Sequence, residues 1–181
     1  VVDLELVAGM AKSGQLFAGY FDKPTPNAPN SEGKAAGPIL QNYTRKPERP
    51  EAGKDLTIEA TLIETNASVS SVKLFYRTMF DEEKSTTMTE TEEGSGIYQG
   101  IIPGSSYKSG EMIRWRYEAE DELGFKTSEP PFLDPKDSHQ YVGTVAADPS
   151  VNSKLSVVEM FLRSPGAAGT VNGTRGAIFY L

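Results

Sequence analysis

Residues 111–121, EMIRWRYEAED, decide the fold, because apolar and polar side chains alternate along them. A period of two with aromatic enrichment is typical of an antiparallel strand with one buried face. The residues predicted to point inward are Ile113, Trp115, Tyr117 and Ala119, and those predicted to point outward are Arg114, Arg116, Glu118 and Glu120. We expect Trp115 to anchor a core between two sheets; the alternative is a residue that stacks on a ligand.

The same alternation recurs on both sides of this stretch, for example in KDLTIEATLI (54–63) and VKLFYRTM (72–79). The predicted strands lie near 38–43, 55–63, 71–79, 85–90, 96–102, 111–120 and 124–128. Short strands separated by turn residues every 8–12 positions or so are typical of immunoglobulin-like and fibronectin-III-like sandwiches. The sequence therefore predicts an all-β, seven-stranded antiparallel sandwich with extended terminal segments.

The segment MTETEEGSGIYQGIIPG (88–104) is predicted to belong to a hairpin. Residues 85–90 and 97–102 form its strands, and the glycines of 91–96 supply the positive φ angles that such turns require. Met88 and Ile102 are expected to pack in the core. The pattern leaves open whether Ile97 or Tyr98 points inward.

Composition bears on the partners of the chain. The formal net charge is −7 and the isoelectric point is near 4.8, so we expect no nucleic-acid partner, since phosphate binding needs a basic face. No apolar run approaches the roughly 20 residues that span a bilayer, so no membrane span is expected. Cysteine is absent, which excludes disulfides, thiolate zinc sites and cysteine nucleophiles. The chain begins at Val1 without a signal peptide, which is typical of a processed or excised piece.

Three N-glycosylation sequons begin at Asn42, Asn66 and Asn172. If the source is a eukaryote, they favour an extracellular or cell-surface protein that carries glycans. The alternative is that these sequons arise by chance, because the chain is rich in Ser and Thr.

Acidic side chains gather at 81–83 and at 118–122. Calcium requires several converging oxygens, often with a glycine that turns the loop, and Gly124 follows the second group. Glu120 and Asp121 are therefore the candidate calcium ligands. The alternative is a set of solvated charges that protects a loop or a sheet edge. No other cofactor is predicted.

Several stretches together resemble a known order of domains. GYFDKPTPNAPN (19–30) resembles the closing strand and tail of a lamin-tail domain. VKLFYRTMF (72–80), GIYQGIIPG (96–104) and IRWRYEAEDELG (113–124) are similar to the sandwich module that follows lamin-tail domains in large secreted proteins. HQYVGTVAADPSVNSKLSVVEMFL (139–162) and GTRGAIFYL (173–181) resemble the start of a CotH-type domain, a relative of the spore-coat kinase.

This resemblance implies a domain organisation. Residues 1–30 would be the end of a lamin-tail-like domain, and 31–53 a Pro- and Gly-rich linker with a first strand. Residues 54–130 would be the immunoglobulin-like core, and 131–181 a linker with the first strands of a CotH-like domain. The catalytic residues of a CotH-type kinase would lie beyond Leu181, so none is assigned here.

No catalytic constellation is predicted, and we expect a chain that is not an enzyme. His139 is the single histidine, with Asp134, Asp137 and Ser138 close in sequence, and a polar surface cluster is the favoured interpretation. GAAGTVNGTRG (166–176) lacks the Gly-Lys-Ser/Thr ending of a phosphate loop and is predicted to be a connecting loop.

Strand-like apolar segments occur near both ends of the chain, and another surface must pack over their apolar faces to keep them from water. Their apolar residues are Leu4, Leu6, Phe17 and Tyr20 at one end and Val158, Phe161, Ile178 and Phe179 at the other. The cover could be the sandwich itself, another copy or another protein, joined through the terminal strands. The main hypothesis is therefore a non-catalytic extracellular spacer or assembly module of a larger protein.

Two alternatives remain at this point. One is the non-catalytic front end of a secreted CotH-type kinase-like protein. The other is a module that binds protein or glycan through the loops at 92–96 and 107–110, with Tyr98 and Tyr107 as the candidate glycan-stacking aromatics.

Overall fold

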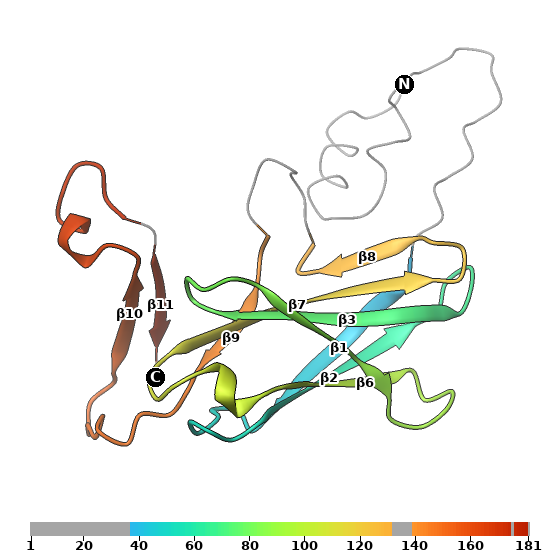
Figure 1. Cartoon of the computed structure of the whole chain (residues 1–181), viewed down its shortest axis with the longest axis horizontal. Helices are drawn as coiled ribbons and strands as arrows, with labels where there is room; N and C mark the ends of the chain where they lie inside the picture. Colours follow the sequence, from blue (N-terminus) through green and yellow to red (C-terminus); the bar gives the residue numbers. More distant parts are fainter. Residues whose placement is uncertain (1–36, 132–138, 175, 181) are drawn as a thin grey trace, which may run out of the picture.

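The computed structural model describes residues 37–131, 139–174 and 176–180, and their main body is a pair of packed antiparallel sheets (Figure 1). The four-stranded sheet has the order β1 (Ile39–Lys46), β2 (Leu56–Ile63), β6 (Ile97–Ile102) and β5 (Thr89–Glu90). The five-stranded sheet has the order β4 (Lys84–Thr87), β3 (Val69–Thr78), β7 (Met112–Asp121) and β8 (Lys126–Glu129), with β9 (Val142–Val145) also paired to β7. This order is that of an immunoglobulin-like sandwich, and it confirms the predicted all-β antiparallel fold. The two sheets contain nine strands in the described residues where the sequence predicted seven.

Helical structure in the described residues is limited to two short 3-10 turns, η2 (Gly104–Ser106) and η3 (Pro165–Ala167). No helix there has the length or the apolar character needed to cross a membrane.

The core lies between the two sheets, and Trp115 is at its centre. All inward positions predicted for 111–121 are buried: Ile113, Trp115, Tyr117 and Ala119. The Trp115 side chain is fully enclosed, and its Nε1 donates a hydrogen bond of 3.0 Å to the Tyr117 hydroxyl. This bond satisfies the indole N–H, which is costly to leave unpaired in an apolar core. Trp115 is therefore the core anchor, as predicted.

The single strand predicted at 85–90 is two strands that belong to different sheets. β4 pairs with β3, whereas β5 pairs with β6 across the sandwich. Met88 lies between them and is buried. Its N–H donates a hydrogen bond of 2.8 Å to the Val72 carbonyl. Changing sheets at this point drives the Met88 side chain into the core, and strands that switch sheets form the corners of sandwiches.

The structure also settles the register of the hairpin at 97–102. Tyr98 pairs with Ala60, packs against the core and is partly buried, whereas Ile97 is 37% exposed. The turn depends on Gly96, whose φ is +67° and whose missing Cβ would lie 2.8 Å from the Leu62 carbonyl oxygen. A side chain at this position would therefore clash with the neighbouring strand.

Strands β8 and β9 together form one edge of the five-stranded sheet. β8 pairs with the second half of β7, and β9 pairs with the first half, where Trp115 is opposite Val142 and Met112 opposite Val145. β8 ends at Glu129 and β9 begins at Val142. Because Thr144, Val145 and Ala146 are all buried, the sandwich continues past residue 130, the boundary predicted for its core.

A separate hairpin, β10 (Val158–Leu162) and β11 (Gly176–Tyr180), stands beside one end of the sandwich (Figure 1). Phe161, Ala177 and Phe179 pack against Met79, Met112 and Val145 of the sandwich. The sandwich itself therefore covers one face of this terminal segment, which is one of the three covers proposed from the sequence. The predicted lamin-tail remnant at 1–30, with Leu4, Leu6, Phe17 and Tyr20, lies outside the described residues.

Candidate functional site

A groove of about 460 Å³ lies between the end of the sandwich and the β10–β11 hairpin. This volume falls in the range of about 300–1,000 Å³ that is usual for ligand sites. The groove is lined by Thr78, Met79, Phe80, Asp81, Gly110, Glu111, Met112, Met160, Phe161, Leu162 and Pro165. Three segments supply it: the end of β3 with the following turn, the start of β7, and the hairpin.

Strand periodicity explains why apolar side chains meet here. Ile113 points into the core, so Met112, its neighbour on β7, must point to the opposite face of the sheet. Met79 follows directly after β3, which pairs with β7 up to Thr78 and Ile113. The hairpin covers these methionines with Phe161 and leaves a hollow beside them.

The groove is apolar inside and acidic at its edge. Phe80 and Met160 are 41% and 60% exposed, so both are accessible to a ligand. Methionine is flexible and polarizable, and it is frequent on surfaces that bind varied apolar groups. The acids are Asp81 and Glu111. Asp81 accepts a hydrogen bond from the Thr78 hydroxyl, and Glu111 accepts one of 2.8 Å from the Lys108 N–H. The arrangement suits an apolar ligand that carries positive charge.

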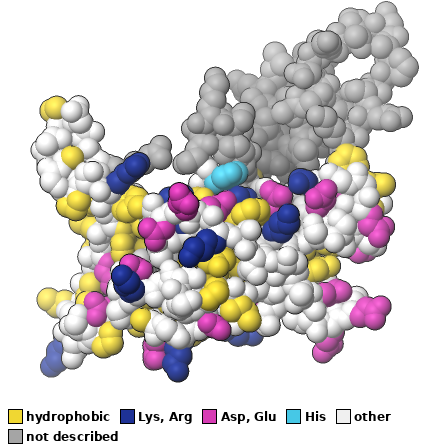
Figure 2. All heavy atoms as spheres, viewed as in Figure 1, with side chains coloured by type: hydrophobic (Ala, Val, Ile, Leu, Met, Phe, Trp, Pro, Cys, Tyr) yellow, Lys and Arg dark blue, Asp and Glu magenta, His cyan; other side chains and the backbone are white. Residues whose placement is uncertain are grey.

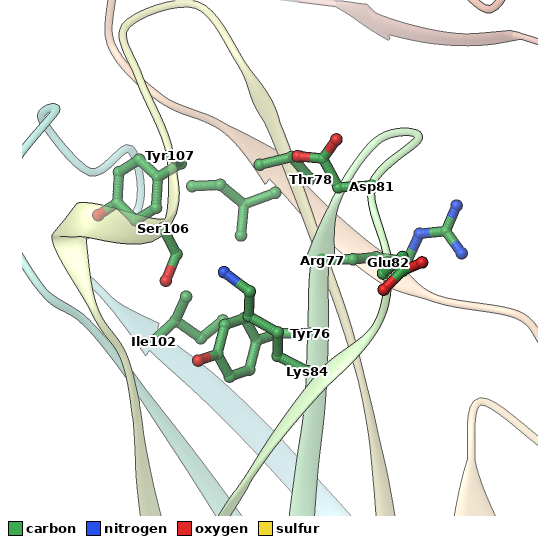
Figure 3. Close-up of a pocket in the computed structure, with 10 residues that line it drawn as sticks. Tyr76, Arg77, Thr78, Asp81, Glu82, Lys84, Ile102, Ser106 and Tyr107 are labelled. Atoms are coloured by element: carbon green, nitrogen blue, oxygen red, sulfur yellow. The ribbon is translucent and has the colours of Figure 1, made fainter.

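A second, much smaller cavity lies inside the same end of the sandwich (Figure 3). Its volume is about 20 Å³, enough for about one water molecule. Tyr76, Ile102 and Tyr107 line it, and the Lys84 amino group and the Ser106 hydroxyl point into it. A cavity of this size accommodates a water molecule and no organic substrate.

The two aromatics proposed for glycan stacking do not form an exposed platform. Tyr107 is buried and its hydroxyl donates to the Lys54 carbonyl, which fixes the loop before β2. Tyr98 packs against the core. The burial of Tyr107 contradicts its proposed stacking role, whereas Tyr98 is only partly buried and its role stays a prediction.

The candidate calcium ligands are engaged with their own chain. Asp121 Oδ1 accepts the N–H groups of Leu123 and Phe125 at 3.0 and 2.8 Å and so closes the turn between β7 and β8. Glu120 forms an ion pair of 3.4 Å with Lys126. In the described part of the chain, no three acidic, His or Cys side chains are grouped so that they could hold a metal ion. The calcium assignment stays a prediction.

Arg116 lies on the outer face of β7, as predicted, but it is only 5% exposed, which the sequence did not indicate. Its guanidinium donates to both Glu83 oxygens at 2.9 and 2.6 Å and lies 3.8 Å from the centroid of the Phe75 ring. Burial alone would raise the pKa of Glu83, but hydrogen bonds from Arg116 and Tyr141 outweigh it and lower that pKa. Within the acidic group at 81–83, Glu83 is therefore a structural partner for Arg116.

The remaining predicted sites lie at the surface. Asn42, Asn66 and Asn172 are all exposed, which leaves each sequon accessible to glycosylation. His139 is exposed as well (Figure 2), while Asp134, Asp137 and Ser138 lie outside the described residues. Residues 166–174 include the end of η3 and lie between β10 and β11, where a connecting loop was predicted.

Comparisons with known proteins add little to this description. A search of protein-family models finds no match, and neither does a search of curated proteins. Eight chains of solved structures match, and one is described as "Crystal structure of Br derivative BhCBM56". That chain is 14% identical, and the match covers 57% of this chain and 90% of that one with a TM-score of 0.37. At this level of similarity, function has to be argued from the groove itself.

Proposed function

We propose that this chain is a non-catalytic assembly module that holds a partner protein at the groove between its sandwich and its β10–β11 hairpin. The observation that carries the proposal is the groove, which is apolar inside, accessible and acidic at its edge. An apolar segment with Lys or Arg at its flanks fits this surface, because the acids Asp81 and Glu111 are at the rim and the chain carries a net charge of −7.

The outer face of the hairpin extends the groove as an apolar surface. Val158 pairs across the strands with Tyr180, and Met160 pairs with Ile178. All four side chains are more than half exposed, with Ile178 at 67%. Contiguous exposed apolar surface of this kind marks interaction sites on soluble proteins.

The hairpin also lacks the features that keep exposed strands from pairing. Natural edge strands carry outward charges or proline. The one charged residue of β10 and β11 is Glu159, which faces the sandwich and lies 3.6 Å from Arg49. Nothing on the outer face of these two strands opposes association with another protein surface.

The proposal is tested by panning a random 12-residue peptide library against the full chain. We expect the selected peptides to be rich in apolar residues flanked by Lys or Arg. The double variant Phe80→Ala/Met160→Ala should weaken their binding at least tenfold, because two exposed groove side chains lose their contacts. The matched control is Ile97→Ala/Ile101→Ala, which truncates exposed apolar side chains on β6.

Equal loss of binding in both double variants, or selected peptides without apolar residues, would contradict the proposal. Sedimentation velocity of the unmodified chain is the companion measurement. Self-association abolished by the groove variant would identify a second copy as the partner.

We further propose that the module belongs to a larger extracellular protein. The support is the resemblance of 19–30 to a lamin-tail ending and of 139–162 to the start of a CotH-type domain, together with the exposure of all three sequons. The front end of a secreted kinase-like protein is the more specific form of this idea. Intact mass and glycan mapping of the protein isolated from its source would test both.

A further inference from the structure

Three arginines lie together on the outer face of the five-stranded sheet. Arg77 of β3 and Arg114 of β7 are direct cross-strand neighbours, and Arg116 is next on the same face of β7. Arg116 is compensated by the bidentate pair with Glu83. Neither Arg77 nor Arg114 forms an ion pair with any residue in the described part of the chain.

Arg77 and Arg114 are held by the same two groups. Both guanidinium groups donate to the Met79 carbonyl oxygen, Arg77 at 3.3 Å. Both also lie over the ring of Tyr141, at 5.7 and 4.8 Å from its centroid. The Tyr141 hydroxyl donates a hydrogen bond of 2.7 Å to Glu83, which fixes the ring against the two guanidinium groups. The two positive groups are thus brought together and oriented by their surroundings.

This arrangement is electrostatically unfavourable without a counter-ion. Like charges directly opposite each other in a sheet are destabilising. The Nε atoms of Arg77 and Arg114 are buried and have no hydrogen-bond partner among the described residues. Burial and the neighbouring charge of Arg77 lower the pKa of Arg114. The ring of Tyr141 offsets part of this cost through cation–π attraction, and an anion would offset more of it.

We propose that Arg77 and Arg114 bind a carboxylate group of a ligand that carries one acidic group. The planar guanidinium fork matches a carboxylate, and Arg116 with Glu83 shows this pairing on the same face of the sheet. A polyanion is disfavoured because the net charge of −7 repels it. Neither arginine lines the proposed groove, although Met79, which accepts their hydrogen bonds, does. The proposal does not depend on a ligand in the groove.

The test is an NMR titration of the full chain that follows the arginine Nε–Hε signals. The probes are D-glucuronate and N-acetyl-L-glutamate, with glucose and N-acetyl-L-glutamine as neutral counterparts. We expect saturable shifts at Arg77 and Arg114 with a carboxylate probe and none with its neutral counterpart. Preference for one acid over the other would distinguish a sugar acid from an acidic side chain as the source of the carboxylate.

Variants locate the site. R77Q and R114Q should each weaken binding by about tenfold or more, which is the usual loss for a hydrogen bond to a charged group. R45Q removes the same charge from β1 in the other sheet and should bind normally. If a Gln variant does not fold, R77K and R114K keep the charge but lose the fork, and they should bind at least threefold more weakly. Absence of saturable shifts, or equal weakening by R45Q, would overturn the proposal.

Discussion

At the scale of single residues, Glu83 and Arg116 show how burial changes the role of a charge. The Arg116 side chain is nearly enclosed, so removing its carboxylate partner leaves a buried charge without compensation. Although it is on the outer face of β7, Arg116 is thus part of the packing. A pair 33 positions apart in sequence joins β7 to the turn before β4.

The first prediction concerns this pair and its dependence on pH. Glu83→Gln should lower the free energy of unfolding by about 2 kcal/mol at pH 7, because Arg116 loses its charged partner. The pKa of Glu83 is lowered in the folded state from an ordinary value of 4.5, so its contribution is present above pH 4.5 and is lost as the pH falls through the folded pKa. Urea denaturation at pH 7 and at successively lower pH below 4.5 should therefore show the two proteins converging.

Glu48→Gln is the control for this experiment. Glu48 is 87% exposed in its pair with Arg45, and exposed pairs contribute about 0–1 kcal/mol. A Glu83 variant as stable as the Glu48 variant at pH 7 would show that the Arg116 pair has no special role.

At the scale of elements, the β10–β11 hairpin has one face on the sandwich and one exposed. A two-stranded hairpin is marginal by itself in water, so its packing against Met79, Met112 and Val145 is what holds it. The Arg49–Glu159 pair adds a second link between the hairpin and the sandwich. The groove exists only while this hairpin stays in place.

We therefore predict that Phe161→Ala frees the hairpin without unfolding the sandwich. Loss of this packing should lower the local opening free energy of β10 and β11 by about 2 kcal/mol. Hydrogen exchange should show faster exchange in these two strands and unchanged protection in β2 and β7. Val158→Ala, on the outer face of β10, is the control and should change neither. Faster exchange throughout the sandwich after Phe161→Ala would show that the hairpin and sandwich unfold as one unit.

At the scale of the whole molecule, the sandwich requires both strands that pair with the same edge of β7, namely β8 and β9. β9 (Val142–Val145) pairs with the first half of β7, where Val142 is opposite Trp115, and the buried Ala146 follows β9. Without this segment the first half of β7 would be an unpaired edge, and the core around Trp115 would open on that side.

Truncation gives the corresponding prediction. A chain of residues 1–150 should keep a single cooperative unfolding transition with buried Trp115 fluorescence, because every strand of the sandwich is retained. A chain of residues 1–130 should lose that transition, because β9 and its buried residues are removed. Thermal denaturation followed by Trp115 fluorescence distinguishes them, since it is the only tryptophan. A cooperative 1–130 chain would place the boundary of the sandwich where the sequence alone suggested it.

The sequence by itself determined most strands of the sandwich, because alternation of apolar and polar side chains is a local property of the pleated backbone. It missed β9 and merged β4 with β5. It correctly predicted the antiparallel all-β class, the buried side of β7, the core position of Trp115 and the hairpin turn at 91–96. Boundaries shifted where backbone pairing extends beyond the apolar pattern, as at the end of β1, which reaches Lys46.

Only the tertiary structure decided which distant segments meet. The switch at Met88, the joining of β8 and β9 along β7, and the pair of Glu83 with Arg116 all depend on contacts between residues far apart in sequence. The groove depends on them most, since Met79, Met112 and Phe161 come from three separate segments. A local pattern shows which face of a strand is apolar, but the surface that covers that face depends on how the whole chain packs.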